Sequence, residues 1–218
     1  GGSNISLLTP KLSTVLTGRN ITFEIFPLSF KEYKTFKPEG ELEEYFEYGG
    51  FPEVVLKKDK LQKRRMLEQY VNDIITKDII EKYELSNVTQ LKALVKFFLN
   101  NPGIKISANK LGKQLGIHKD TAQKYIEYMK DTFLIFEVPF FSYSAKTKYI
   151  GAHAPKYYCI DNGLHTITTT KKNKGALWEN AVAIKLLQTN KEFFYWQDLV
   201  EIDFVVDGKA IQIGRAHV

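Results

Sequence analysis

The first half of the chain carries hydrophobic residues at helical spacing, interrupted by turns. The longest such pattern runs from about Lys60 to Tyr83, where apolar side chains recur at i, i+3, i+4 and i+7. Charged side chains fill the opposite face, so we expect one long helix whose apolar stripe packs in the core. The stripe consists of Leu67, Tyr70, Val71, Ile74, Ile75 and Ile79.

Shorter elements are expected before this helix. Helices are predicted over 5–18 and 41–48, and another begins at Ser29, with Glu32 placed to complete a capping box. The alternation of apolar and polar residues over Ile21–Ile25 predicts a strand.

The second half of the chain begins with helices and ends in strands. Asp207 and Gly208 predict a tight hairpin turn near the end. The expected helices are Val88–Asn100, Ser107–Gly116, Lys119–Asp131 and Leu177–Gln188. The expected strands are Phe133–Val138, Phe140–Tyr143, Lys156–Asp161, Phe193–Trp196, Ile202–Val206 and Ala210–Ile213. The last part is therefore expected to be α/β, and the chain as a whole α+β.

Composition narrows the class of protein. A hydrophobic share of 44% and a charged share of 26% exclude a disordered chain, a collagen and a coiled-coil rod. The apolar runs are too short for a membrane helix, so we expect no membrane partner. The single cysteine, Cys159, excludes a disulfide framework and points to a reducing, cytoplasmic setting. The net charge of +6 favours a polyanionic partner.

Residues 108–129 resemble a helix-turn-helix. Apolar side chains would hold two helices across a tight turn, in which Gly116 supplies the backbone conformation. Those side chains are Leu111, Leu115, Ile117, Ala122 and Ile126. The strands on either side of Pro139 would form the wing of a winged helix.

The exposed side of this motif is the candidate DNA-binding surface. Lys and His side chains there would contact phosphates, and Gln123 would read an adenine edge. Glu127 would repel a phosphate backbone, and winged helices also dock proteins, so both partners remain open. The candidate residues are Lys110, Lys113, His118, Lys119, Gln123 and Lys124.

A second constellation combines Glu179, Asp203 and Gln212. The order helix, strand, strand, strand resembles the core of the restriction-endonuclease-like fold, in which an Asp and a Glu-x-Lys pair hold Mg²⁺ for phosphodiester hydrolysis. Here Gln212 stands at the Glu position and Gly214 at the Lys position, so the pattern is degenerate. Asp203 remains a weak candidate metal ligand, and a solvated strand edge is the alternative interpretation.

Several short segments follow one another in a specific order along the chain. They are Gly2–Asn4, Leu16–Arg19, Phe26–Glu32, Tyr48–Glu53, Tyr158–Leu164, Leu177–Asn180 and Glu201–Phe204. Together they resemble one family, the archaeal and bacterial AAA-type ATPases that carry a C-terminal domain of unknown function, over about residues 2–212. The resemblance implies a preceding part with the Walker segments, with Asn4 orienting the water that attacks ATP and Arg19 sensing the γ-phosphate.

The resemblance also implies a division of the chain. The last residues match the translation of a common sequencing-adapter read, so we expect a fragment of a longer protein. The expected parts are an ATPase-domain remnant (1–40), a helical connector (41–87), a winged helix (88–144), a small mixed-sheet nuclease-like domain (145–212) and an adapter tail (213–218).

The first functional hypothesis is a DNA-associated C-terminal part of an ATPase. The parent would bind ATP and Mg²⁺, act on double-stranded DNA and assemble as a homo-oligomer. The fragment alone would need no cofactor and would not hydrolyse ATP, because it lacks a phosphate-binding loop. The alternatives are a Mg²⁺-dependent DNase that uses Glu179 and Asp203, and a non-catalytic module that docks a protein.

Overall fold

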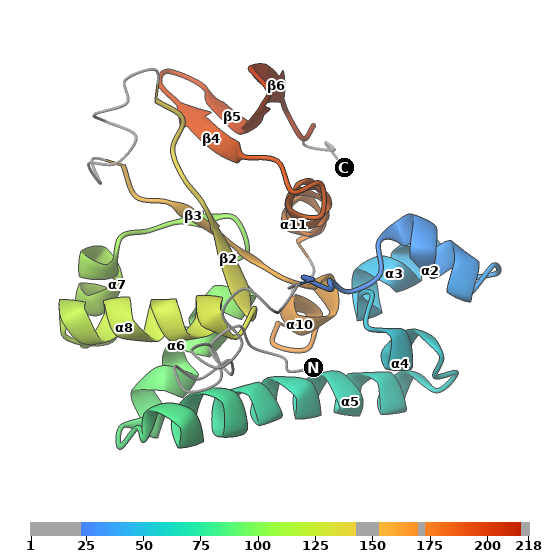
Figure 1. Cartoon of the computed structure of the whole chain (residues 1–218), viewed down its shortest axis with the longest axis horizontal. Coiled ribbons are helices and arrows are strands. Elements are labelled where there is room, and N and C mark those ends of the chain that lie inside the picture. The colour runs from blue at the N-terminus through green and yellow to red at the C-terminus, as the bar shows by residue number, and fades with distance from the viewer. Residues whose placement is uncertain (1–22, 143–152, 170–172, 215–218) are drawn as a thin grey trace, which may run out of the picture.

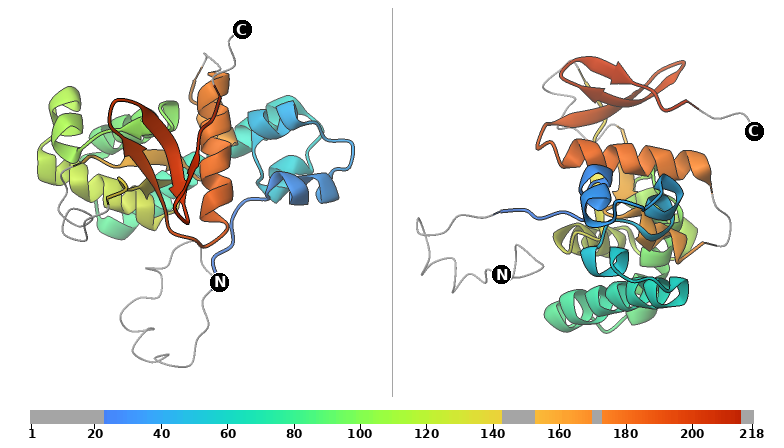
Figure 2. Two further views of the ribbon diagram at one scale, coloured as in Figure 1. Left: turned by 90° about the horizontal axis from the view of Figure 1, so that it is seen from above. Right: turned by 90° about the vertical axis from the view of Figure 1, so that its right-hand side faces the viewer.

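The computed structural model describes residues 23–142, 153–169 and 173–214. It has an α+β fold, as predicted, with two three-stranded antiparallel sheets among many helices. Figure 1 shows helix α5 along one side of the molecule and strands β4, β5 and β6 on the opposite side, with β2 and β3 between them. The right-hand view of Figure 2 shows α5 and the β4–β6 strands on opposite sides again. Within the described ranges, no helix combines the length and the apolar character needed to cross a membrane.

Short helices form the first described segment. The Ser29 hydroxyl accepts the backbone N–H of Glu32, and the Glu32 carboxylate accepts the backbone N–H of Ser29, so the predicted capping box is confirmed. The strand expected over Ile21–Ile25 is wrong in its described part, because Phe23 and Ile25 are exposed and have no strand beside them. The predicted helix over 5–18 lies outside the described residues. The helices here are α2 (Phe30–Phe36), α3 (Leu42–Tyr48) and α4 (Pro52–Val55).

The long helical pattern is confirmed as one continuous rod. Helix α5 (Lys60–Asp73) runs directly into the π-helix η2 (Ile74–Glu81). The apolar stripe packs in the core as predicted, with Tyr70 and Ile74 half-buried at its edge. Its buried members are Leu67, Val71, Ile75 and Ile79. The apolar pattern predicts the rod but not its change to a π-helix, which is a rare element.

The middle of the chain folds in the order helix, strand, helix, helix, strand, strand. Strand β3 lies between β1 and β2 and is antiparallel to both. Gly116 closes α7 in the left-handed conformation (φ 65°), which a residue with a Cβ atom rarely adopts. The elements are α6 (Val88–Asn100), β1 (Ile104–Lys105), α7 (Ala108–Leu115), α8 (Lys119–Asp131), β2 (Ile135–Val138) and β3 (Lys156–Cys159).

The expected hairpin on either side of Pro139 is wrong. Strand β2 pairs instead with β3, where Ile135 lies opposite Cys159. Phe140 makes a parallel bridge to Tyr195, and the Pro139 carbonyl accepts the Tyr195 N–H. Proline has no N–H to offer a neighbouring strand, which favours a change of partner here. The expected boundary between 88–144 and 145–212 therefore separates two strands that the structure pairs.

The last part is a helix followed by an antiparallel sheet. The predicted hairpin is confirmed, because Asp207 (φ 49°) and Gly208 (φ 73°) both have the positive φ of its tight turn. The predicted mixed sheet is wrong for the strands β4, β5 and β6, which all pair antiparallel. Asn162 and Gly163, expected only to close a strand, begin a short helix. The elements are α10 (Asn162–Thr166), α11 (Lys174–Leu187), β4 (Phe193–Gln197), β5 (Glu201–Val206) and β6 (Lys209–Ile211).

Asp161 joins the first helices to the rest of the molecule. Its buried carboxylate accepts the backbone N–H groups of Gly50 (2.6 Å) and Gly163 (2.7 Å). Burial outweighs these hydrogen bonds and raises the pKa of Asp161 to about 6. Gly49 (φ 73°) lies against the same carboxylate, and a Cβ atom there would overlap it. The Asp161 carboxylate thus brings two of the short segments, Tyr48–Glu53 and Tyr158–Leu164, into contact.

Candidate functional site

The residues of the predicted nuclease-like constellation converge in space. Glu179 comes from α11, Asp203 from β5, and Gln212 follows β6. The Gln212 side-chain amide donates to Asp203 Oδ2 at 2.9 Å. Glu179 and Asp203 both approach the ammonium group of Lys156.

Lys156 is the centre of the cluster. Its side chain is 3% exposed, and its Nζ lies 3.1 Å from Glu179 Oε1, 2.5 Å from Glu201 Oε1 and 3.9 Å from Asp203 Oδ1. We call Lys156, Glu179, Glu201 and Asp203 the Lys156 cluster. Burial would lower the pKa of Lys156, but the charges and hydrogen bonds of Glu179 and Glu201 outweigh it and raise the pKa above its usual value.

Strand β3 places Lys156 in the interior because it is the central strand of its sheet. Every residue of β3 is buried. Successive side chains on a strand point to opposite faces. Tyr157 packs against Phe98 of α6, with ring centroids 4.9 Å apart, whereas Tyr158 and Lys156 reach Glu179 of α11. The same alternation therefore sends an aromatic ring to one face and the buried ammonium to the other.

Tyr158 completes the hydrogen bonding of Glu179. Its hydroxyl donates to Glu179 Oε1 at 2.7 Å. Burial, and next the charge of Glu179, raise the pKa of Tyr158, so the hydroxyl stays protonated and keeps donating. Asp203 is satisfied in a similar way, since its Oδ2 also accepts the backbone N–H of Ile213 at 2.7 Å. The carboxylates of the cluster are thus held by donors of the chain itself.

The donor set does not fit a divalent cation. Mg²⁺ requires several oxygen ligands around a compact octahedral centre. Here the oxygens of Glu179 and Asp203 accept hydrogen bonds from Tyr158, Gln212 and Ile213, and the Lys156 ammonium lies among the carboxylates. Among the described residues, no three His, Cys, Asp or Glu side chains are grouped closely enough to hold a metal ion.

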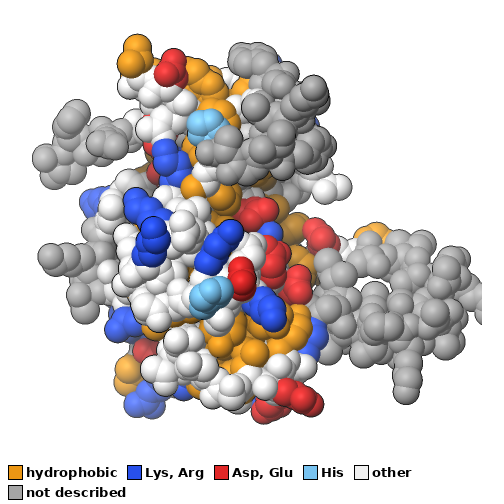
Figure 3. Space-filling view, turned by 90° about the vertical axis from the view of Figure 1, so that its left-hand side faces the viewer, with side chains coloured by type: hydrophobic (Ala, Val, Ile, Leu, Met, Phe, Trp, Pro, Cys, Tyr) orange, Lys and Arg blue, Asp and Glu red, His pale blue; other side chains and the backbone are white. Residues whose placement is uncertain are grey.

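The candidate DNA-binding residues lie on the surface of α7 and α8. All six are exposed: Lys110, Lys113, His118, Lys119, Gln123 and Lys124. Figure 3 faces this side of the molecule and shows Lys side chains and a His side chain, with Asp and Glu side chains nearby. The four lysines have no ion-pair partner among residues 23–142, 153–169 and 173–214. Their charges are therefore available to a ligand.

Two of the six residues make contacts within the protein. His118 caps α8 by accepting the Asp120 N–H, and its ring lies 3.6 Å from the Asp120 carboxylate. The Gln123 amide donates to Glu127 at 2.9 Å. Both side chains are exposed, so a ligand could replace these contacts at little cost in buried area.

The other predicted site residues, Asn4 and Arg19, lie outside the described residues.

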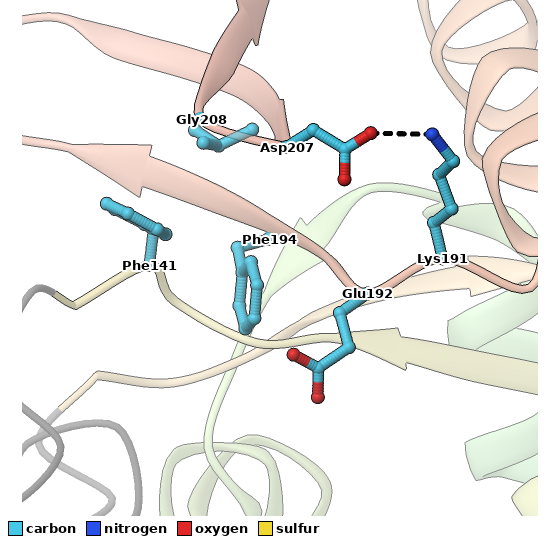
Figure 4. Close-up of a pocket in the computed structure, with 7 residues that line it drawn as sticks. Phe141, Lys191, Glu192, Phe194, Asp207 and Gly208 are labelled. Atoms are coloured by element: carbon cyan, nitrogen blue, oxygen red, sulfur yellow. Dashed lines mark hydrogen bonds and ion pairs between the residues drawn. The ribbon is translucent and has the colours of Figure 1, made fainter.

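One cavity, of about 310 Å³, is bounded by Phe141, Phe194 and Val205. Figure 4 shows its rim, where Lys191 and Asp207 point toward each other and form an ion pair at 2.6 Å. None of the predicted site residues lines it. We therefore base the site on the α7–α8 surface and the Lys156 cluster rather than on a cavity.

Sequence reasoning missed the central residue of the cluster. Lys156 begins a short apolar run, and the run gives no sign that the lysine is buried. Glu201 was included in the segment Glu201–Phe204 but not among the candidate site residues. The one available signal was a lysine inside a strand that is otherwise apolar, but its partners follow in the sequence by more than twenty residues.

Comparison with known proteins adds the family. Residues 39–174 match a family model described as a domain of unknown function, DUF8612. The uncharacterized protein MJ1544 of Methanocaldococcus jannaschii is 32% identical over 233 residues, which cover 95% of this chain and 52% of that protein. An uncharacterized protein of Haemophilus influenzae is 31% identical over 220 residues, with 94% and 54% covered. No solved structure matches the chain.

The chain thus spans about half the length of these curated relatives. The family match extends from α3 through α10, and so includes Lys156 and the whole α7–α8 surface. Because the match covers well over half of the sequence, the chain belongs to the DUF8612 family.

Proposed function

We propose that this chain is the DNA-binding, non-catalytic C-terminal part of an AAA-type ATPase, and that it binds double-stranded DNA through α7 and α8. The observation that carries the proposal is the exposed lysine surface on a helix pair that is backed by a three-stranded sheet. The ATPase part of the proposal rests on the resemblance of short sequence segments alone.

The order of the elements supports a winged helix. A helix, a strand, two helices and two strands follow one another, and the last strand, β3, lies in the middle of the sheet. In this arrangement the second helix of the helix-turn-helix, α8, is the recognition helix that enters the major groove. Strands β2 and β3 supply the antiparallel pair that follows the recognition helix.

The chemistry of the α7–α8 surface supports a phosphate backbone as the ligand. Lysines bind phosphates as point charges and release counterions from the duplex. Lys119 and Lys124 lie on α8 itself, whereas Lys110 and Lys113 extend the charge onto α7. Gln123 would read an adenine edge once its amide leaves Glu127.

In the parent protein, ATP and Mg²⁺ would bind to the part that carries the Walker segments. Asn4 would orient the attacking water and Arg19 would stabilise charge on the γ-phosphate. The 218-residue chain alone should not hydrolyse ATP. Mg²⁺-dependent ATP turnover by the purified chain would contradict this part of the proposal.

The test is binding of a fluorescent DNA duplex, followed by anisotropy at low and moderate salt. The wild-type chain should bind, and Lys119→Ala/Lys124→Ala should weaken binding by about tenfold, because two phosphate contacts are lost. The matched control is Lys57→Ala/Lys58→Ala, which removes the same charge from an exposed segment between α4 and α5. That control should bind like the wild type.

Two results would contradict the proposal. One is no binding to duplex at low salt, which would favour the alternative of a protein-docking module. The other is an equal loss of affinity in both double variants, which would mean that net charge, and not the α7–α8 surface, determines binding.

A further inference from the structure

The carboxylates of the Lys156 cluster surround a cation that belongs to the protein itself, the Lys156 ammonium. A buried ammonium is tolerated only when opposite charges and hydrogen bonds replace its hydration. Lys156 has three carboxylates within 4.0 Å, from α11 and β5, while its own backbone belongs to β3. The three elements therefore meet at one positive charge.

The residues of the predicted nuclease-like constellation lie in this cluster or beside it. Glu179 and Asp203 converge from a helix and a strand, and Gln212 joins them from the segment after β6. In place of a divalent ion, however, the space among the carboxylates holds the Lys156 ammonium. A dication placed beside that ammonium would be repelled by it and would also have to displace the donors on Glu179 and Asp203.

We infer that the Lys156 ammonium takes the place of the divalent cation, so that the cluster is a metal-independent charge clamp that docks α11 and the β4–β6 sheet onto β3. The clamp joins the two sheets of the molecule. It is independent of DNA binding by α7 and α8, which involves none of its residues.

The inference predicts that removing the ammonium lets the three carboxylates, which are not grouped closely enough to hold a metal ion as the structure places them, move together around a cation. Lys156→Met keeps the length and the apolar stem of the side chain but removes the charge, and three carboxylates then face one another. Mn²⁺ accepts the same oxygen ligands as Mg²⁺ and can be followed by electron paramagnetic resonance. The test is thermal unfolding of the full chain in chelator and in Mn²⁺ at matched ionic strength, combined with titration of free Mn²⁺.

The expected results differ between the variants. Mn²⁺ should leave the Tm of the wild type unchanged. It should raise the Tm of Lys156→Met by roughly 2–4 °C or more, the shift expected for a chain of this size when free Mn²⁺ exceeds its Kd about tenfold. Lys156→Met/Asp203→Asn should lose the effect. Lys191→Met, which breaks an exposed ion pair, is the matched control and should not respond.

Three results would overturn the inference. The first is Mn²⁺ binding by the wild type that Glu179→Gln or Asp203→Asn abolishes. The second is nicking of supercoiled plasmid by the wild type with the same dependence, which would instead establish the nuclease alternative. The third is a folded Lys156→Met that gains no response to Mn²⁺. If Lys156→Met is unfolded in chelator, recovery of its folded circular dichroism signal in Mn²⁺ supports the inference. The two results on the wild type, Mn²⁺ binding and plasmid nicking, would still overturn it.

Discussion

Lysine has two different roles in this molecule, one on the α7–α8 surface and the other at the centre of the Lys156 cluster. Lys119 and Lys124 are exposed, and no carboxylate of the described residues pairs with them. Lys156 is buried and pairs with three carboxylates. The charge of the first two is available to a ligand, whereas the charge of Lys156 stabilises the fold. Composition counts all three equally, so a net positive charge says little about where an anion would bind.

The largest expected effect is a loss of stability when the buried charge of Lys156 is removed. Lys156→Met should lower the free energy of unfolding by about 3 kcal/mol, because it leaves carboxylates of Glu179 and Asp203 partly buried without their counter-charge. Urea unfolding in the presence of chelator measures it. In the matched control Lys191→Met, an ion pair with both side chains more than half exposed is lost, and the cost should stay below about 1 kcal/mol. Equal costs for both variants would contradict a structural role for Lys156.

The next largest effect is on DNA affinity: substituting two lysines of the α7–α8 surface should weaken binding without changing stability. For the wild type, the logarithm of the duplex binding constant should fall linearly with the logarithm of salt concentration. In Lys119→Ala/Lys124→Ala the slope should be smaller by about 1.8, since each lost phosphate contact removes about 0.9. The free energy of unfolding should stay within about 0.5 kcal/mol of the wild type. A smaller affinity with an unchanged slope would mean that these lysines do not contact phosphates.

The smallest effect is a pH dependence at the alkaline end. The pKa of Lys156 is raised in the folded protein, so the folded state keeps a proton that the unfolded chain loses. The stabilisation by Lys156 is therefore complete below the pKa of free lysine, about 10.4, and is lost as pH rises through the higher folded pKa. Urea unfolding from about pH 8 to pH 11 should show a constant difference between wild type and Lys156→Met that shrinks only at the upper end. A difference that already falls near pH 9 would place the folded pKa below that of free lysine.

Local chemistry in the sequence predicted much of the fold. The capping box at Ser29, the left-handed turn at Gly116 and the hairpin at Asp207 each depend on residues within a few positions, and each is confirmed. Pairing between distant strands could not be predicted in this way. Pro139 was expected to lie inside a hairpin, but β2 pairs with β3, whose partner residues lie some twenty positions away.

The same difference between local signals and long-range contacts decides which parts of the candidate site could be predicted. The surface residues of α7 and α8 follow from helical spacing, because a residue's exposure depends on which side of its own helix it occupies. Glu179, Asp203 and Gln212 were predicted to converge from the order of elements, and they do. Lys156 was missed because its burial depends on β3 being central in its sheet, and on α6 and α11 covering it from opposite sides. Those are properties of the tertiary structure, with no local signal.

Chemical labelling of lysine amines, read by mass spectrometry with and without duplex DNA, tests the central claim most directly. Lys110, Lys113, Lys119 and Lys124 should react quickly in the free protein and become protected by duplex at low salt. Lys156 should stay unreactive in both samples until the chain is unfolded. Rapid labelling of Lys156 in the folded protein, or labelling of the α7–α8 lysines that duplex leaves unchanged, would contradict the account.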